Sequence, residues 1–390
     1  MIKHLFKLIW HKRRKHFLLM SEIFIAFLVV FAVSSLLVYY YGNYRKPVGL
    51  EYENVWVVHL YNTNQLKGDT LTQQLDKVRQ TLKGFQEIEA YSFCGSNVPF
   101  SMSSSNTDVF YKNNRTMANI YMVEPAYFDV LGIKKTAGRT LEQADLHAAH
   151  PTLVANESLR KALFPNETPT GIAISMGDTE HKIVGVVNDF KDKGNFQPTE
   201  PGIFRLIKDD EIPFMNTILM KVSSNAGISL EENLWKRLSG LSPDVTVEIE
   251  RMADKRITVN KITWVPMLIF GIVCGFLIFN VALGLFGVLW YNINLRKEEI
   301  GIRRALGATG KQVTRQFIGE ALVIATFAMG LGAVLAVQFP LLEVFDVSAS
   351  VYVGGLVLAI VFLYSVVWVC AFYPGAQAAG VEPAVALHDN

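Results

Sequence analysis

Four long apolar stretches with almost no charge constrain this chain more than any other feature. They cover residues 17–41, 264–291, 318–339 and 351–373. Each can cross about 30 Å of hydrocarbon, which takes about 20 helical residues. The last stretch has thirteen Leu, Ile, Val or Phe among its 23 residues and no charge. We therefore expect four transmembrane helices.

The second stretch lies inside a longer charge-free run, over residues 262–295. At about 1.5 Å per residue, a helix of this length reaches about 50 Å. We therefore expect residues 264–291 to form both a span and a stalk that projects beyond the bilayer.

The distribution of Lys and Arg predicts the orientation of the spans. Residues 1–16 hold several cations and no acid, cations gather again in residues 292–317, and residues 340–350 hold two acids and no cation. Short loops rich in Lys and Arg stay in the cytoplasm. We therefore predict cytoplasmic termini, with residues 374–390 as a cytoplasmic tail, and place residues 42–263 outside.

The first span is predicted to be an uncleaved anchor and not a signal peptide. Its apolar stretch is too long for a signal peptide, and it ends in three tyrosines at 39–41 instead of a small-residue cleavage site. Before it, apolar residues recur at helical spacing among lysines at residues 2–9. Residues 1–16 are thus interpreted as an amphipathic segment on the inner membrane face, or simply as a topology signal.

The outer region, residues 42–263, is predicted to be an α+β domain inserted between the first and second spans. Asn156 is predicted to cap the second of its two expected helices. The expected strands are 55–60, 120–123, 152–155 and 182–187, the expected helices 71–82 and 157–164, and the expected loops 99–106 and 189–199.

Nothing in the outer region predicts catalysis or metal binding. Cys94 is its one cysteine, and the eight histidines of the chain form no H-E-x-x-H motif. Glu180, His181 and Asp189 are interpreted as scattered surface residues. The net charge of +2 provides no basic field for nucleic acid. We therefore expect a non-catalytic membrane subunit.

The segment KEEIGIRRALGATGKQVTRQF, residues 297–317, is the most informative part of the chain. Two glutamates at its front and Arg303 and Arg304 farther on suit the dipole of a short helix, which Gly307 is placed to end. Ile302 and Leu306 share one face of this helix, with Ala305 beside them. The helix could simply tether two spans, or it could dock into a cytosolic partner.

The same segment contains a partial match to a phosphate-binding loop. Gly310 and Lys311 fit the end of G-x-x-x-x-G-K-[ST], but Ala305 stands where the first glycine is required and Gln312 follows the lysine. The chain is therefore not predicted to bind ATP itself, and no cofactor is expected in it.

Several motifs in register resemble the MacB/FtsX-type permease subunits of ABC transporters. EIGIRRALGAT, residues 299–309, is similar to their coupling helix, and YPGAQAAGVEPAVALH, residues 373–388, to their closing segment. YFDVLGIKKTAGRTL, NESLRKALFP and HKIVGVVNDF, starting at residues 127, 156 and 181, resemble the MacB-like periplasmic core domain. The resemblance covers essentially the whole chain.

The resemblance implies a bacterial inner-membrane protein with two copies of a separate ATP-binding subunit, which binds ATP and Mg²⁺. It also implies a second permease chain, identical or paralogous, and allows a periplasmic adaptor or effector. The residues that match the coupling helix, and so are expected to contact the ATPase, are Glu299, Ile300, Gly301, Arg303, Arg304, Ala305, Leu306, Gly307 and Ala308. One departure is the uncharged run at residues 376–379, where family members usually carry basic residues.

The spans contain too few polar groups to line a channel for a hydrophilic solute. These groups are Ser34, Ser35, Asn280, Gln338 and Ser365. We therefore expect the chain to transmit force from the ATPase to the outer domain, for export or extraction of a periplasmic or membrane substrate. Two alternatives stay open: a signalling lever that controls a cell-wall hydrolase or senses antimicrobial peptides, and an anchored binding module without an ATPase.

Two features of the spans have open interpretations. Gly271 and Gly275 form a G-x-x-x-G motif, which predicts close helix packing either in a dimer or within the chain. Glu320 near the start of the third span is either a functional intramembrane acid or a residue at headgroup level beside Arg315 and the loop of residues 292–317.

Overall fold

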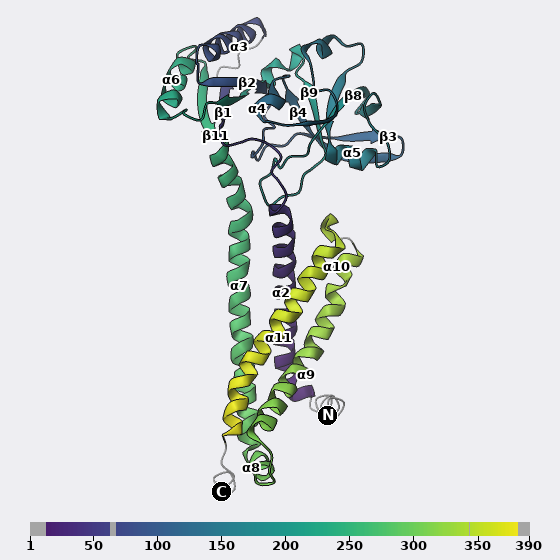
Figure 1. The fold of residues 1–390 in the computed structure, drawn as a ribbon, viewed down its shortest axis with the longest axis vertical. Coiled ribbons are helices and arrows are strands. Elements are labelled where there is room, and N and C mark those ends of the chain that lie inside the picture. Colours follow the sequence, from purple (N-terminus) through teal and green to yellow (C-terminus); the bar gives the residue numbers. More distant parts are fainter. Residues whose placement is uncertain (1–12, 63–67, 343, 381–390) are drawn as a thin grey trace. The chain divides into compact units, whose positions relative to one another are not determined.

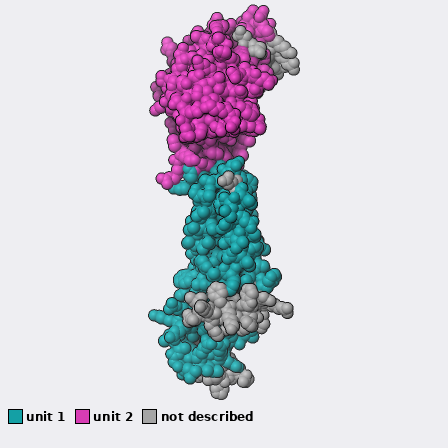
Figure 2. Space-filling model, turned by 90° about the vertical axis from the view of Figure 1, so that its right-hand side faces the viewer, with its two compact units in different colours: residues 1–42, 264–390 teal, residues 43–263 magenta. Residues whose placement is uncertain are grey.

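The computed structural model describes residues 13–62, 68–342 and 344–380 (Figure 1). The chain divides into two compact units (Figure 2). One consists of Met1–Gly42 with Trp264–Asn390, and the other of Asn43–Thr263. The first contains the apolar helices and the second is an α+β domain inserted between the first two of them. The predicted fold class is thus confirmed.

Four helices are long and apolar enough to cross a membrane. They are α2 (Arg13–Tyr44), α7 (Met252–Leu295), α9 (Gly310–Ala336) and α11 (Ala349–Ala379). Helix α7 begins twelve residues before the expected span. Its first turns are polar on one side, and Met252 and Val259 on the other side are buried in the core of the α+β domain. Burial on one face therefore extends this helix beyond the apolar run.

Shorter helices connect the long ones: α8 (Lys297–Ala305), α10 (Gln338–Leu341) and the 3-10 turn η3 (Val344–Asp346). The long helices pack most closely where one of them carries glycine. A Cβ on Gly332 of α9 would lie 2.3 Å from Cδ1 of Phe27, a fully buried side chain of α2. A Cβ on Gly355 of α11 would lie 2.2 Å from Oγ of Ser35 on α2. The two glycines let α9 and α11 approach α2.

The first half of the α+β domain is an antiparallel sheet covered by two helices. Its strand order is β11 (Val245–Arg251), β1 (Val55–Asn62), β10 (Thr217–Val222) and β2 (Ile88–Cys94). Helices α3 (Gly68–Lys83) and α6 (Ile228–Ser239) bury leucine-rich stripes against it. Figure 1 shows the two helices next to each other at this sheet.

The second half of the domain closes on itself, because its first and last strands pair. The order is β4 (Asn114–Val123), β3 (Asn106–Tyr111), β7 (Ala173–Met176), β8 (Thr179–Val187), β6 (Thr152–Asn156) and β9 (Gly202–Leu206), and β9 pairs in parallel with β4. Strand β5 (Lys135–Gly138) adds to β8. The remaining elements are α4 (Tyr127–Val130), α5 (Glu157–Leu163), η1 (Gln143–His147) and η2 (Asp209–Phe214). One pair, Cys94 with Val123, joins the halves of the sheet.

Each predicted strand lies within an observed one, and the predicted cap is confirmed. Oδ1 of Asn156 accepts a hydrogen bond from the Leu159 amide at 2.9 Å, at the start of α5. The sequence analysis did not identify β10, in which five of six residues are buried. Burial on both faces removes the alternation that marks a strand.

Replacing Gly332 with Ala should destabilise the helical unit, because the new methyl group would overlap the buried ring of Phe27. Overpacking of this kind costs about 1–3 kcal/mol. We expect a lower midpoint of thermal unfolding for the full chain in detergent. Gly330→Ala, two residues away with nothing within 4 Å of the added Cβ, is the matched control and should leave the midpoint unchanged or slightly higher. Equal midpoints for the two variants would contradict the packing.

Candidate functional site

Helix α8, in the loop between α7 and α9, has a favourable charge at each end and a defined C-terminal cap. Glu298 and Glu299 lie in its first turn and Arg303 and Arg304 in its last turn. Gly307 has a φ of +96°; its amide donates to the carbonyl of Arg304 at 3.1 Å, and the amide of Ala308 donates to that of Arg303 at 3.0 Å. This pair of bonds is the Schellman motif, and it confirms the predicted end of the helix.

Arg296, which the sequence analysis did not single out, fastens α8 to α9. Its Nε donates to Oε2 of Glu299 at 2.9 Å, and its Nη1 donates to Oε2 of Glu320 at 3.0 Å. The guanidinium also lies 5.5 Å from the centre of the Phe317 ring. The hydrogen bond to Glu299 raises the pKa of Arg296, so this residue stays charged.

The ion-pair partner of Glu320 is Arg296, a residue of the predicted loop, and not Arg315. Five residues separate Arg315 from Glu320, which turns their side chains about 140° apart around α9. The acid therefore faces the end of α7, where Arg296 lies. Gln316 also donates to its carboxylate, at 3.1 Å.

A small apolar cluster seats α8 against the ends of three long helices. Ile300 is 4% exposed, and its neighbours in the cluster are Ile293 of α7, Val313 and Phe317 of α9, and Ala378 of α11. In addition, Nη1 of Arg304 donates to the carbonyl of Ala379. The position of α8 is thus set by α7, α9 and α11 together.

The opposite face of α8 exposes apolar side chains. Leu306 is 83% exposed and Ile302 is 49% exposed, and Ala305 next to them is exposed as well. Ile300, and not the pair of Ile302 and Leu306, is therefore the residue that packs against the span helices. The apolar pair is left free to contact a partner.

The other residues that match the family's coupling helix are distributed between these two faces. Gly301 is buried and Gly307 is exposed, while Ala308 is half-buried. Glu299 and Arg303 form an ion pair, and Nη1 of Arg303 donates to Oε1 of Gln316 at 2.7 Å. Glu299 and Arg303 are therefore held in place by side-chain contacts beside the exposed apolar face.

Gly310 and Lys311, which partly match a phosphate-binding loop, instead begin α9. The Thr309 amide donates to Oε1 of Gln312 at 2.9 Å, which completes a capping box. Gln312, the residue that departs from the phosphate-loop pattern, is thus the one that closes this helix end.

Of the three polar residues interpreted as surface residues, Glu180 is exposed and Asp189 is half-buried, but His181 is buried, at 4% exposed, so that interpretation is wrong for His181. The amide of Ser158 donates to Asp189 at 2.7 Å, and burial lowers the pKa of His181. Burial also raises the pKa of the Cys94 thiol well above its usual value. Among the residues that the structure describes, no group of three or more His, Cys, Asp or Glu could hold a metal ion.

A second site is formed by residues 188–199, and the sequence predicted residues 189–199 only as a loop. Lys191 is fully buried, and its ammonium group donates to three carbonyls. These belong to Asn43, to Lys46 at 2.7 Å and to Asn195 at 3.0 Å. A cation near the last carbonyls of a helix is favourable, and Asn43 lies in the last turn of α2. Lys191 thus fixes the end of α2 to this loop.

The same loop also holds the first turns of α7. The amide of Asn195 donates to Oδ1 of Asn260 at 2.8 Å, and Nε of Arg256 donates to Oδ1 of Asn195 at 3.0 Å. Next to it, Gly194 has a φ of +96°, and a Cβ there would lie 2.8 Å from the Asn260 side chain. Residues 188–199 are called the clasp below, because they bind α2 and α7 at once.

Two family models together cover nearly the whole chain. The MacB-like periplasmic core domain matches residues 17–259, and the FtsX-like permease C-terminal region matches residues 263–383. The chain belongs to the FtsX-like permease family and carries a MacB-like periplasmic core domain. This confirms the predicted family. The clasp lies within the first matched region of the permease, and α8 lies within the second.

Curated relatives of this permease include two groups of transport proteins. It is 25% identical over 311 residues to an uncharacterized ABC transporter permease, YvrN of Bacillus subtilis, with 73% of each chain covered. It is 25% identical over 283 residues to the macrolide export ATP-binding/permease protein MacB of Aggregatibacter actinomycetemcomitans, covering 71% of this chain and 43% of that protein. The permease spans about half the length of the MacB relatives it matches.

Solved structures similar to the permease include the periplasmic region of MacB from Actinobacillus actinomycetemcomitans. The match has 21% identity and a TM-score of 0.39, and it covers 53% of this chain and 92% of that one. Another is the extracellular domain of the transporter YknZ, with 12% identity and a TM-score of 0.34, covering 49% and 99% of the two chains.

Replacing Lys191 with Met should destabilise the α+β domain by about 2–4 kcal/mol, because buried carbonyls lose their donor. We expect a lower midpoint in thermal unfolding of the full permease in detergent. Lys182→Met is the control, since Lys182 is exposed on β8 and should tolerate the change. A Lys191→Met variant as stable as the control would show that the clasp is not fastened through this ammonium group.

Proposed function

We propose that this chain is the transmembrane subunit of an ABC transporter, in which it passes the work of a separate cytosolic ATPase to its periplasmic domain. The observation that carries the proposal is the shape of α8. One face is fixed to the ends of α7, α9 and α11, and the other presents Leu306 and Ile302 to solvent. A rigid base with an exposed apolar tip is suited to docking in a partner.

Two helices provide a route from α8 to the periplasmic domain. Helix α7 is continuous from Met252 to Leu295, and the next residue is Arg296, which attaches α8 to α9. At its other end the clasp binds its first turns together with the last turn of α2. A displacement of α8 by the ATPase would therefore reach the clasp along α7 and act on both helices there.

Helices that carry force need no polar channel, and the described spans are consistent with this. Ser365 donates to its own helix at Val361, and Asn280 donates in the same way to Phe276. These two polar groups thus form hydrogen bonds within their own helices instead of lining a path. The transported or extracted substrate would then be handled by the periplasmic domain or drawn from the membrane.

The orientation in this proposal follows the charge of the loops. The loop with α8 and both termini lie in the cytoplasm of a bacterial cell, and the domain of residues 43–263 lies in the periplasm. Two copies of an ATP-binding subunit, which hold ATP and Mg²⁺, contact residues 299–308. The names of the relatives, an ABC transporter permease and a macrolide export ATP-binding/permease protein, support a role next to an ATP-binding component.

A second permease chain, identical or paralogous, is proposed to pack along α7. Gly271 and Gly275 have nothing within 4 Å of an added Cβ, so neither contacts another helix among the described residues. Packing within the chain, one of the two readings of this motif, is therefore not observed. In contrast, an added Cβ on Gly284 would lie 2.6 Å from Oε2 of Glu22. The open G-x-x-x-G face can accept a helix of a partner chain.

Replacing Leu306 with Asp should uncouple the ATPase from the permease. Loss of an apolar contact at the centre of a docking site, together with burial of a charge, should weaken binding at least about 30-fold. The measurement is copurification of the ATPase, followed by ATP-dependent distance changes between labels in the periplasmic domain. Because Leu306 is 83% exposed, thermal stability should be unchanged.

Leu306→Met is the control for this variant and should keep both binding and motion, because it preserves an apolar side chain of similar size. Unchanged copurification and label motion in Leu306→Asp would refute the docking role of α8.

Replacing Gly271 and Gly275 with Leu should weaken association of two permease chains, since bulky side chains prevent close helix approach. Crosslinking in membranes would measure the dimer fraction. Gly287→Leu is the control: it lies on the same helix, also with open space at its Cβ, but about 120° around the helix from Gly275. If the two variants lower the dimer fraction equally, the interface does not run along the G-x-x-x-G face.

A further inference from the structure

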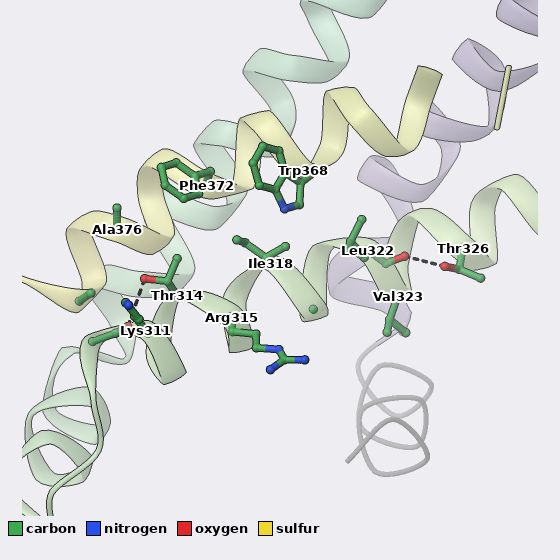
Figure 3. A pocket seen from close by; sticks show the side chains of 13 residues that line it. Lys311, Thr314, Arg315, Ile318, Leu322, Val323, Thr326, Trp368, Phe372 and Ala376 are labelled. Carbon is green, nitrogen blue, oxygen red and sulfur yellow. Dashed lines mark hydrogen bonds between the residues drawn. The ribbon is translucent and has the colours of Figure 1, made fainter. Parts of the chain in front are cut away.

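A groove of about 950 Å³ lies between α9 and α11, within the helical unit. Figure 3 shows Ile318 and Leu322 of α9 opposite Phe372 and Trp368 of α11, with Lys311 and Arg315 toward one end. The groove begins at Gly310, directly after the loop that holds α8. It therefore combines a charged end with an apolar channel.

The charged end has two cations that no described residue neutralises. Lys311 and Arg315 lie one turn apart at the start of α9, and both side chains are exposed. Neither forms a hydrogen bond or an ion pair with a residue in the described parts of the chain. Arg296 and Arg303, in contrast, are bound to glutamates. The positive end of the α9 dipole adds to the potential here.

The groove as a whole is long enough for a phosphate and part of an acyl chain. From Gly310 to Thr326, its lining residues extend over sixteen helical steps of α9, or about 24 Å, and the apolar part from Ile318 to Thr326 accounts for about 12 Å of this. Small residues open this space on α11, where Ala376 and Ala379 face the groove. Both belong to the uncharged run of residues 376–379. Their small side chains leave room in the groove, and its cations are on α9.

We propose that this groove is a binding site for one anionic phospholipid of the cytoplasmic leaflet. Its phosphate lies between Lys311 and Arg315, and one acyl chain runs along Ile318 and Leu322 toward Trp368. The assignment to the cytoplasmic leaflet rests on the orientation proposed above. A ligand with a negative head and a long apolar tail is the chemistry that matches both ends of the groove.

Charge also decides between this ligand and the chain's own amino-terminal segment. Residues 1–12 hold lysines at positions 3, 7 and 12 and no acid, so they would bring positive charge to Lys311 and Arg315. Like charges repel, whereas a phosphate neutralises the two cations. Charge therefore favours the anionic lipid over the amino-terminal segment.

One residue that lines the groove also takes part in the attachment of α8. The carbonyl of Ala379, a lining residue, accepts from Arg304 of α8. Thr314, another lining residue, donates from Oγ1 to the carbonyl of Gly375 at 2.9 Å. A lipid in the groove would therefore contact both helices next to the bonds that fix α8. The lipid composition of the inner leaflet would therefore affect how rigidly α8 is held against α7, α9 and α11.

The test uses Trp368 as a reporter, because this side chain lines the groove and is 50% exposed. The full chain is reconstituted in phosphatidylcholine vesicles that contain a minor fraction of phosphatidylglycerol, with bromine placed midway along the acyl chains of one lipid or the other. Bromine quenches tryptophan fluorescence on contact. The signal of Trp368 is the difference between the chain and its Trp368→Phe variant.

We expect brominated phosphatidylglycerol to reach Trp368 with a relative affinity about tenfold above that of brominated phosphatidylcholine, as two cations beside one phosphate imply. The double variant Lys311→Gln, Arg315→Gln should reduce this ratio to about one. Lys297→Gln removes an exposed cation of α8 outside the groove and should keep the ratio. Ala376→Phe, which fills the groove and leaves the charge intact, should lower quenching by both lipids.

Equal quenching by the two brominated lipids in the unchanged chain would overturn the proposal, as would a preference that both charge-removing variants abolish equally. A phosphatidylglycerol preference that arises only after residues 2–12 are deleted would show that this segment occupies the groove instead. These measurements need no ATPase. Failure of the lipid site therefore leaves the docking of α8 to be judged by the Leu306→Asp experiment alone.

Discussion

The permease depends on the attachment of α8 to the ends of three membrane helices. A short helix of nine residues is marginal in isolation. Here Arg296 binds Glu299 and Glu320, and Ile300 is buried among side chains of α7, α9 and α11. Because both attachments use helix ends, α8 can be displaced only together with those helices. This is the property that a coupling element requires.

The clasp also attaches to helix ends, in the α+β domain, but it does so through a buried ammonium group and an asparagine. A buried ammonium group satisfies three carbonyls around the end of α2, and Asn195 holds the start of α7. Loops that carry buried charge are costly unless each charge is bonded. The cost of burying the Lys191 charge is offset here because its ammonium group donates to three carbonyls. The domain thereby fixes two helix ends in one loop.

Small residues set how closely the membrane helices approach and where they leave space. Gly332 and Gly355 bring α9 and α11 against α2, because any larger side chain would overlap it. Ala376 and Ala379 instead leave a groove beside two cations that pair with no described residue. The same type of residue thus gives tight packing in one place and a binding site in another, according to what lies opposite.

The sequence by itself determined the four spans, the inserted α+β domain, the Asn156 cap and the end of α8 at Gly307. These depend on long apolar runs and on local hydrogen bonds, which neighbouring residues decide. Tertiary structure decided the partner of Glu320, the role of Lys191 and the exposure of Leu306. In each of these, the deciding contact comes from a residue far away in the chain, or from a helix face whose burial depends on its neighbours. Periodicity identified an apolar face on α8, but only packing showed that Ile300 is buried and Leu306 is free.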